Sequence, residues 1–215
     1  MLGVHPQSWA LWLGEAIELP VRILATDGAR SADLVRDQLP RVGDGYDVAC
    51  LYIGANDARA TDFDGSAFAQ DVRTAVDRLR RAADRLVVLT IPEDLGRPRA
   101  GADVLAVNET IRALARGAGA VLVELRDFGG RRVVLPDAVH PTAPGMVAIA
   151  DRAAAALGET GVRVVTRPHD LCQARTSRRD RARYGAWWGR QWLRDRARQT
   201  RERRRARPSG RTERP

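Results

Sequence analysis

Four short segments within the first 166 residues are mostly apolar and rich in Val, Ile or Leu. They are Pro20–Thr26, Asp47–Ile53, Arg85–Ile91 and Ala120–Leu125. A short apolar run without alternation is typical of a parallel β-strand that is covered on both faces. A glycine or a proline follows each of the first three runs within two residues, as expected where a buried strand ends. The sequence therefore predicts four buried strands.

Segments with apolar residues at helical spacing flank and separate these strands. They are Ser8–Glu18, Ser31–Leu39, Ser66–Ala83, Ala102–Ala118 and Pro144–Leu157. Ser31 is expected to cap its helix, and Pro144 stands at an early helical position, where proline is favoured. The alternation of helix and strand predicts an α/β fold. We expect a three-layer sandwich in which a parallel sheet with right-handed crossovers lies between helices.

The charge is distributed unevenly along the chain. Its 36 basic residues are all arginine, and with 27 acidic residues they give a net charge of +9. Residues 1–166 hold 19 arginines and 22 acids, whereas residues 167–215 hold 17 arginines and five acids. The basic character therefore belongs to the C-terminal part alone. We predict a globular domain over residues 1–166 and a basic tail over residues 167–215, which becomes disordered after Pro208.

The basic tail carries aromatic residues at helical spacing. Tyr184, Trp187, Trp188 and Trp192 stand at i, i+3, i+4 and i+8, which places them on one face of a basic amphipathic helix. The helix could pack this face on the globular domain, lie in the surface of an anionic membrane, or contact nucleic acid through charge. The last interpretation is the least favoured, because the sequence holds no nucleic-acid-binding motif.

Composition excludes several classes of protein. Two cysteines, Cys50 and Cys172, are too few for a disulfide scaffold or a cysteine-rich zinc site. No apolar run approaches the roughly 20 residues that a membrane-spanning helix needs. The first ten residues lack the basic start and the small-residue cleavage site of a signal peptide. A cytoplasmic location is therefore expected, with a peripheral membrane location as the alternative if the tail binds lipid.

Three motifs stand where ligands bind in open α/β sheets, beyond the carboxyl ends of the strands. Gly28 follows the first apolar run, and its backbone N–H could approach a ligand or simply form a turn. Asn56 follows the second run and could donate its amide to an oxyanion, or form an Asx turn with Asp57. Asp137 stands three residues before His140. It could orient this histidine as a general base, or the pair could form a surface turn.

Taken together, these motifs resemble the SGNH hydrolase superfamily, the GDSL-type esterases and lipases, over roughly residues 6–160. The resemblance implies a flavodoxin-like sandwich with a five-stranded parallel sheet, and hydrolysis of small-molecule esters through an acyl-enzyme. It implies that Asp137 and His140 belong to a Ser-His-Asp triad and that Gly28 and Asn56 form the oxyanion hole. It implies no metal and no organic cofactor.

The sequence departs from this family at its start. The family begins with a central strand followed by Gly-Asp-Ser, whose serine is the nucleophile, whereas this chain begins close to the family's first helix, at Gln7-Ser8-Trp9. The absent strand would lie between the runs Pro20–Thr26 and Asp47–Ile53. Leaving these two strands unpaired costs about 1–3 kcal/mol for each buried backbone group. Either they pair directly with each other, or the true N-terminus lies upstream, which we favour.

No serine of the chain has the family's nucleophile pattern. Ser8 stands at a helix start with no strand before it, and Ser31 stands where a helix cap is expected, so neither is a strong candidate for the nucleophile. We predict an ester hydrolase domain that is inactive as residues 1–215. The alternatives are a non-catalytic, ligand-binding domain of the same fold, and a protein that binds membrane surfaces through its tail.

Overall fold

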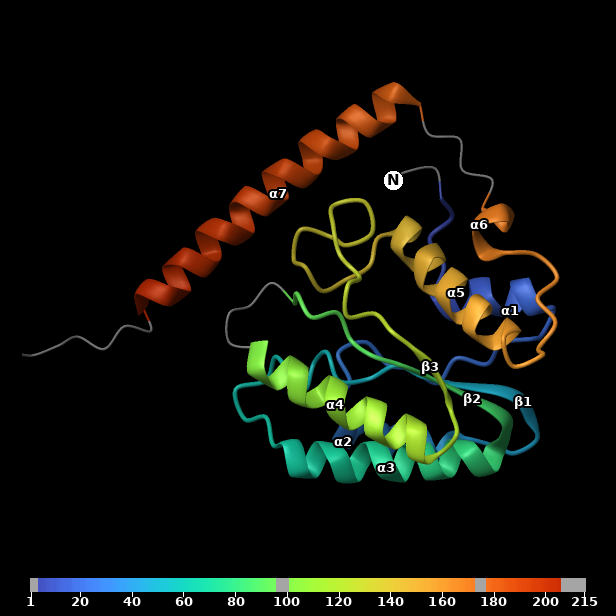
Figure 1. Ribbon diagram of the computed structural model, residues 1–215. Coiled ribbons are helices and arrows are strands. Elements are labelled where there is room, and N and C mark those ends of the chain that lie inside the picture. The colour runs from blue at the N-terminus through green and yellow to red at the C-terminus, as the bar shows by residue number, and fades with distance from the viewer. Residues whose placement is uncertain (1–3, 96–100, 173–176, 206–215) are drawn as a thin grey trace, which may run out of the picture.

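A computed structural model describes residues 4–95, 101–172 and 177–205 of the chain (Figure 1). Its centre is a parallel sheet with the strand order β1-β2-β3. The strands are β1 (Tyr46–Leu51), β2 (Ala83–Leu89) and β3 (Val121–Val123). In the register of the sheet, Val48 lies beside Arg85 and Val88 beside Leu122. Three of the four predicted strands and the parallel α/β fold are thereby confirmed.

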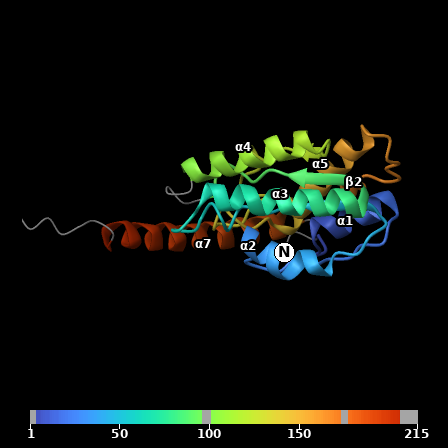
Figure 2. The same cartoon turned by 90° about the horizontal axis from the view of Figure 1, so that it is seen from below.

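Helices cover both faces of the sheet (Figures 1 and 2). On one face lie α3 (Gly65–Ala82) and α4 (Gly101–Gly117), and on the other lie α1 (Trp9–Ile17) and α5 (Ala143–Gly158). The shorter elements and the C-terminal helix are α2 (Ser31–Asp33), η1 (Leu34–Gln38), η2 (Leu39–Arg41), α6 (Pro168–Leu171) and α7 (Arg178–Arg205). The result is the predicted three-layer sandwich.

Local capping explains where α1, α3 and α5 begin. The Ser8 hydroxyl accepts a hydrogen bond from the backbone at the start of α1, and the Asp64 carboxylate and Thr142 hydroxyl do the same for α3 and α5, as side-chain caps do. The expected cap at Ser31 is wrong, because α2 begins at Ser31 itself and Arg30 occupies the cap position. The helix expected from there to Leu39 is a succession of short α, π and 3₁₀ segments.

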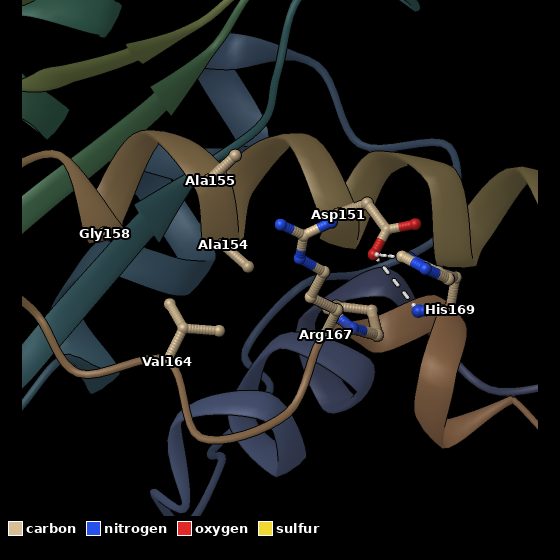
Figure 3. Close-up of a pocket in the computed structure, with 8 residues that line it drawn as sticks. Asp151, Ala154, Ala155, Gly158, Val164, Arg167 and His169 are labelled. Atoms are coloured by element: carbon tan, nitrogen blue, oxygen red, sulfur yellow. Dashed lines mark hydrogen bonds and ion pairs between the residues drawn. The ribbon is translucent and has the colours of Figure 1, made fainter.

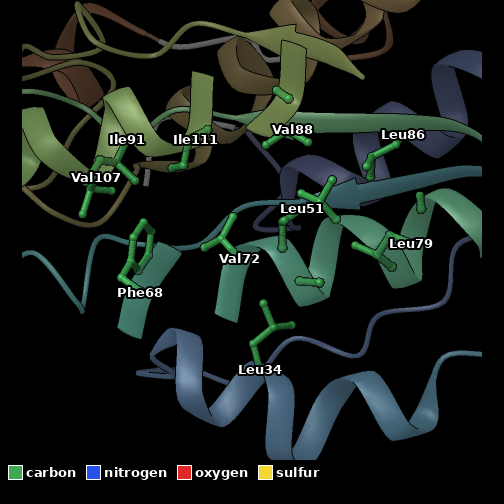
Figure 4. Close-up of a cluster of buried hydrophobic side chains, with 14 of the residues drawn as sticks. Leu34, Leu51, Phe68, Val72, Leu79, Leu86, Val88, Ile91, Val107 and Ile111 are labelled. Atoms are coloured by element: carbon green, nitrogen blue, oxygen red, sulfur yellow. The ribbon is translucent and has the colours of Figure 1, made fainter. Parts of the chain in front are cut away.

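The core is divided between the two faces of the sheet, and β2 contributes to both halves. Leu86 and Val88 point to the cluster under α3 and α4, which Figure 4 shows, whereas Val87 and Leu89 point to the cluster under α1 and α5. All four are at most 1% exposed. Successive side chains of a strand point to opposite faces, so a strand with two buried faces appears in the sequence as one uninterrupted apolar run.

The first predicted strand, Pro20–Thr26, is not formed. This segment has no regular secondary structure, and none of its described backbone groups is hydrogen-bonded to β1. Among the described residues, the one hydrogen bond between the two is a side-chain bond, in which Arg22 Nη1 donates to Tyr46 Oη at 3.3 Å. Val21 and Ile23 are 38% and 46% exposed. A β-strand needs a backbone partner at its side, and the apolar pattern of a segment does not provide one.

β1 therefore forms an edge of the described sheet. The two runs expected to flank a central strand do not pair directly with each other, so this arrangement, one of the two expected, is wrong. The three strands of the described sheet are consistent with a truncated sheet. An edge strand of this kind presents a row of free N–H and C=O groups that can pair with a further strand.

The helix α7 divides the aromatic residues of the tail between the domain and solvent. Tyr184 is only 9% exposed, whereas Trp192 is 38% and the adjacent Leu193 is 63% exposed.

The segment after Pro208, for which disorder is predicted, lies outside the described residues. None of the helices that the structure describes is long and apolar enough to cross a membrane.

Candidate active site

The loop between β3 and α5 carries the predicted acid and histidine, and polar side chains fix its beginning. The buried Thr90 hydroxyl accepts a hydrogen bond from Leu125 N at 2.7 Å and donates to Glu124 Oε2 at 3.2 Å. Glu124 in turn accepts two hydrogen bonds from the Arg112 guanidinium, at 2.7 and 2.9 Å. This paired arrangement is among the stronger side-chain interactions, and it links β2, α4 and the loop.

The structure brings Asp137 and His140 together. Asp137 Oδ2 lies 2.7 Å from His140 Nδ1. The other carboxylate oxygen, Oδ1, accepts hydrogen bonds from the backbone N–H groups of Val139 and His140, at 2.9 and 3.0 Å. The His140 side chain is 69% exposed, and its Nε2 has no partner among the described residues. A carboxylate on Nδ1 with an open Nε2 is the orientation that a general base requires.

A strained residue turns the chain between these two side chains. Ala138 has φ +58°, in the left-handed region that residues other than glycine rarely adopt. This turn lets both N–H groups that follow point back to Asp137 Oδ1. Such strain costs on the order of 1–3 kcal/mol and is concentrated at functional sites. No sequence signal predicts this turn, because alanine has no preference for this conformation.

The Asp137 carboxyl is held in its ionised form. Burial raises its pKa, but the hydrogen bonds from Val139 N, from the His140 ring and from His140 N together outweigh burial, so that the pKa lies below its usual range. A lowered pKa in the folded state means that ionised Asp137 stabilises the fold above its usual pKa, and that this contribution is lost as the pH falls through the lowered value. Asp137 is therefore a carboxylate throughout the neutral range.

The two predicted oxyanion-hole residues lie on loops that are bonded to each other. Asn56 Nδ2 donates to the carbonyl oxygen of Ala29 at 3.0 Å, and Asp57 Oδ1 accepts from Ser31 N at 2.9 Å. One N–H of the Asn56 amide remains for another acceptor, because an amide NH₂ carries two donors. Gly28, next to Ala29, is exposed with φ +78°, and its N–H has no acceptor among the described residues.

The two serines considered as nucleophiles are engaged elsewhere. The Ser31 hydroxyl is buried and donates to Asp71 Oδ2 at 2.8 Å. Ser8 Oγ caps α1 by accepting from Leu11 N at 3.4 Å. Neither is hydrogen-bonded to His140 among the described residues. Likewise, no described bond joins the Asp137–His140 pair to the loops of Gly28 and Asn56.

A second histidine–carboxylate pair joins α5 and α6, beside a cavity of about 550 Å³ (Figure 3). His169 Nδ1 lies 3.2 Å from Asp151 Oδ1, and His169 Nε2 lies 3.1 Å from Asp170 Oδ1. Both ring nitrogens therefore face carboxylates, and no nitrogen is left to act as a base. Groups of three or more acidic, histidine or cysteine side chains that could hold a metal are absent from the described part of the chain.

The fold and the site together define a class of protein: a three-layer α/β sandwich with a carboxylate–histidine pair in the loop before its last sandwich helix. Within that class, a model of the GDSL-like lipase/acylhydrolase family matches residues 3–148. This match spans more than half of the chain, and the protein belongs to this family. The resemblance to SGNH hydrolases is thereby confirmed.

Solved structures of known hydrolases have the same fold. LAE5, an alpha/beta hydrolase enzyme from the metagenome of Lake Arreo, Spain, is 18% identical with a TM-score of 0.59, over 73% of this chain and 86% of that one. The acetylxylan esterase Axe2 from Geobacillus stearothermophilus is 16% identical (TM-score 0.56, 73% and 84%). The acetyl xylan esterase AlAXEase is 20% identical (TM-score 0.56, 70% and 90%). None of the curated proteins compared with this chain matches it.

Proposed function

We propose that this domain is the catalytic unit of a GDSL-type ester hydrolase, in which His140 is the general base and Asp137 orients it. The observation that carries the proposal is the contact of 2.7 Å between Asp137 Oδ2 and His140 Nδ1, with His140 Nε2 open to solvent. Two of the similar structures are acetylxylan esterases, which favours a small acyl or acetyl ester as the substrate.

In the proposed ester hydrolysis, His140, Asp137, Gly28 and Asn56 have separate roles. A serine hydroxyl attacks the acyl carbonyl while His140 Nε2 takes its proton, and Asp137 stabilises the resulting imidazolium. The oxyanion of the tetrahedral intermediate accepts hydrogen bonds from the Gly28 N–H and from the free N–H of Asn56. The intermediate collapses when His140 returns the proton to the leaving alcohol. Water then attacks the acyl-serine by the same route and releases the acid.

The nucleophile comes from a segment outside residues 1–215 that pairs with the free edge of β1. The support is the lack of backbone pairing at this edge: no backbone bond joins the described segment Pro20–Thr26 to β1, although the Arg22 side chain reaches Tyr46. A strand inserted there would satisfy the free backbone groups on either side of it. Its carboxyl end would carry the serine to the edge of the sheet where ligands bind.

The test compares residues 1–215 with a lengthened chain, in which the in-frame coding sequence upstream of Met1 adds a strand followed by Gly-Asp-Ser. Hydrolysis of p-nitrophenyl acetate is measured for both chains and for His140→Ala in each. Residues 1–215 and their His140→Ala variant are expected to be equal to background. The lengthened chain is expected to be at least about 10³-fold faster, and its His140→Ala variant to lose that gain.

Two results would contradict this assignment. If residues 1–215 hydrolysed the ester in a reaction that depends on His140, the nucleophile would be assigned to Ser8 or Ser31. A lengthened chain that folds but does not hydrolyse esters, or an upstream sequence without such a segment, would favour a non-catalytic domain that binds an ester or carbohydrate ligand.

A second function is favoured by the exposed half of α7. Trp192 and Leu193 are exposed to solvent beyond the part of the helix that contacts the domain. The exposed residues Arg190, Arg194 and Arg196 flank them, and the Arg196 guanidinium lies 4.9 Å from the centre of the Trp192 ring. Tryptophan at headgroup depth with arginines around it is typical of a helix that binds the surface of an anionic membrane.

Vesicle co-sedimentation tests this second function. The protein is expected to bind vesicles of phosphatidylcholine with phosphatidylglycerol and not vesicles of phosphatidylcholine alone. The double variant Trp192→Ala, Leu193→Ala is expected to bind about 10-fold more weakly, because two apolar side chains no longer enter the interface. Leu105→Ala, which removes another exposed apolar side chain on α4, is the matched control. Equal binding by all three proteins would show that α7 acts by charge alone and would contradict the proposal.

A further inference from the structure

The loop over residues 129–142, which we term the catalytic loop, is folded as an irregular hairpin. Leu135 N donates to the carbonyl of His140 at 2.8 Å, and Thr142 N donates to that of Val133 at 2.9 Å. Val134 and Pro141 face each other as an antiparallel bridge. The hairpin sets the position of His140, because its two arms meet on either side of the Asp137–His140 turn.

Within residues 130–135 of this loop, most backbone carbonyls are satisfied locally. Gly130 O accepts from Val133 N and Val134 N, and Leu135 O accepts from Ala138 N. Arg132 O accepts from the Thr142 hydroxyl. The carbonyls of Arg131 and Val134 are the two in this range that no donor of the loop reaches. An unsatisfied carbonyl beside a buried side chain such as Val134, which is 7% exposed, is costly.

The helix α7 supplies the two missing donors. Tyr184 Oη donates to Arg131 O at 3.0 Å, and Trp188 Nε1 donates to Val134 O at 3.3 Å. Tyr184 and Trp188 stand four residues apart, on one face of the helix, so one rigid element bonds two points of the loop. Figure 1 shows α7 crossing beside this loop. These two donors lie more than 40 residues beyond the catalytic pair in the sequence.

We infer that Tyr184 and Trp188 are positioning residues, which hold the catalytic loop in the form that presents His140. The inference rests on the proposed function in calling the loop catalytic, and it assigns α7 a role in the active site that is separate from lipid binding. Neither side chain is expected to touch substrate. Their effect on His140 passes through the backbone of residues 131–134 and through the hairpin bonds at Leu135 and Thr142.

The test uses the full chain and does not require turnover, so it can fail independently of the proposed function. Tyr184→Phe and Trp188→Phe each remove one donor and keep an aromatic ring. Each is expected to speed hydrogen exchange at the Leu135 and Thr142 amides about fivefold, and the double variant about 30-fold, as expected for one and two lost hydrogen bonds. Trp192→Phe, on the exposed part of the same helix, is the matched control and is expected to leave both amides unchanged.

The ¹⁵N resonances of the His140 ring add a readout that a merely structural role would not move. With the loop held, the neutral ring carries its proton on Nδ1, facing Asp137. In the double variant, we expect a mixture of the two tautomers, while exchange at Val88 in the central strand stays unchanged. Unchanged loop amides and an unchanged tautomer in a folded double variant would overturn the inference. So would a double variant in which α7 detaches while the loop keeps its protection.

Discussion

Asp137→Asn in the lengthened chain is expected to lower kcat for ester hydrolysis by about 10⁴-fold while leaving the fold intact. The amide keeps the shape of the carboxylate and can still accept hydrogen bonds from Val139 N and His140 N. It cannot stabilise the imidazolium that His140 forms, and its NH₂ group favours the wrong tautomer of the ring. His140→Ala is expected to cost at least as much, because it removes the base itself.

The second histidine–carboxylate pair provides a matched control for this prediction. Asp151→Asn removes the same charge beside His169, where both ring nitrogens face carboxylates. The kcat of Asp151→Asn is expected to stay within about twofold of the kcat of the unsubstituted lengthened chain, as for most surface substitutions. Equal losses in Asp137→Asn and Asp151→Asn would show that the Asp137–His140 pair has no special role.

The pH dependence of ester hydrolysis by the lengthened chain is constrained by the lowered pKa of Asp137. Because this carboxyl stays ionised down to pH values below its usual pKa of about 4, its protonation begins only in more acidic solution. Any loss of activity between about pH 5 and 7 must therefore come from another group.

Gly145→Ala is expected to destabilise the protein by about 2–3 kcal/mol, the range of overpacking at a site that cannot give way. Gly145 lies in the first turn of α5, where a Cβ would overlap the backbone carbonyl of Val133 in the catalytic loop and lie 3.2 Å from Pro141 Cβ. Either α5 or the loop must shift, and both are held by the Thr142 cap. We expect the midpoint of thermal unfolding to fall by about 5–10 °C, measured by circular dichroism.

Gly185→Ala in α7 is the control for this substitution. A Cβ at Gly185 would meet no atom within 4 Å, and alanine is a better helix former than glycine by about 0.5–1 kcal/mol. Gly185→Ala is therefore expected to stabilise α7 slightly. If Gly145→Ala were also neutral or stabilising, the close packing of α5 against the catalytic loop would be wrong.

Much of the scaffold could be predicted because its signals are local. The strand β2 ends in the apolar run Leu86–Leu89, which is buried on both faces of the sheet, and Ser8 caps α1 because serine at that position bonds the first turn of a helix. The Asp137–His140 pair was also visible, since three residues of separation allow an Asx-type turn to bring the two side chains together. Each of these features depends on residues that are neighbours in the sequence.

The remaining features depend on partners far away in the chain. Pro20–Thr26 has the composition of a strand, but pairing decides whether a strand forms, and β1 offers it no backbone bond. The spacing of the tail aromatics predicted a single face. Only the tertiary structure divides that face, since Tyr184 and Trp188 meet two free carbonyls of the catalytic loop whereas Trp192 lies beyond it. The sequence thus determined most of the elements and the pairing of Asp137 with His140, and non-local hydrogen bonding decided which elements join and what holds the loop of this pair.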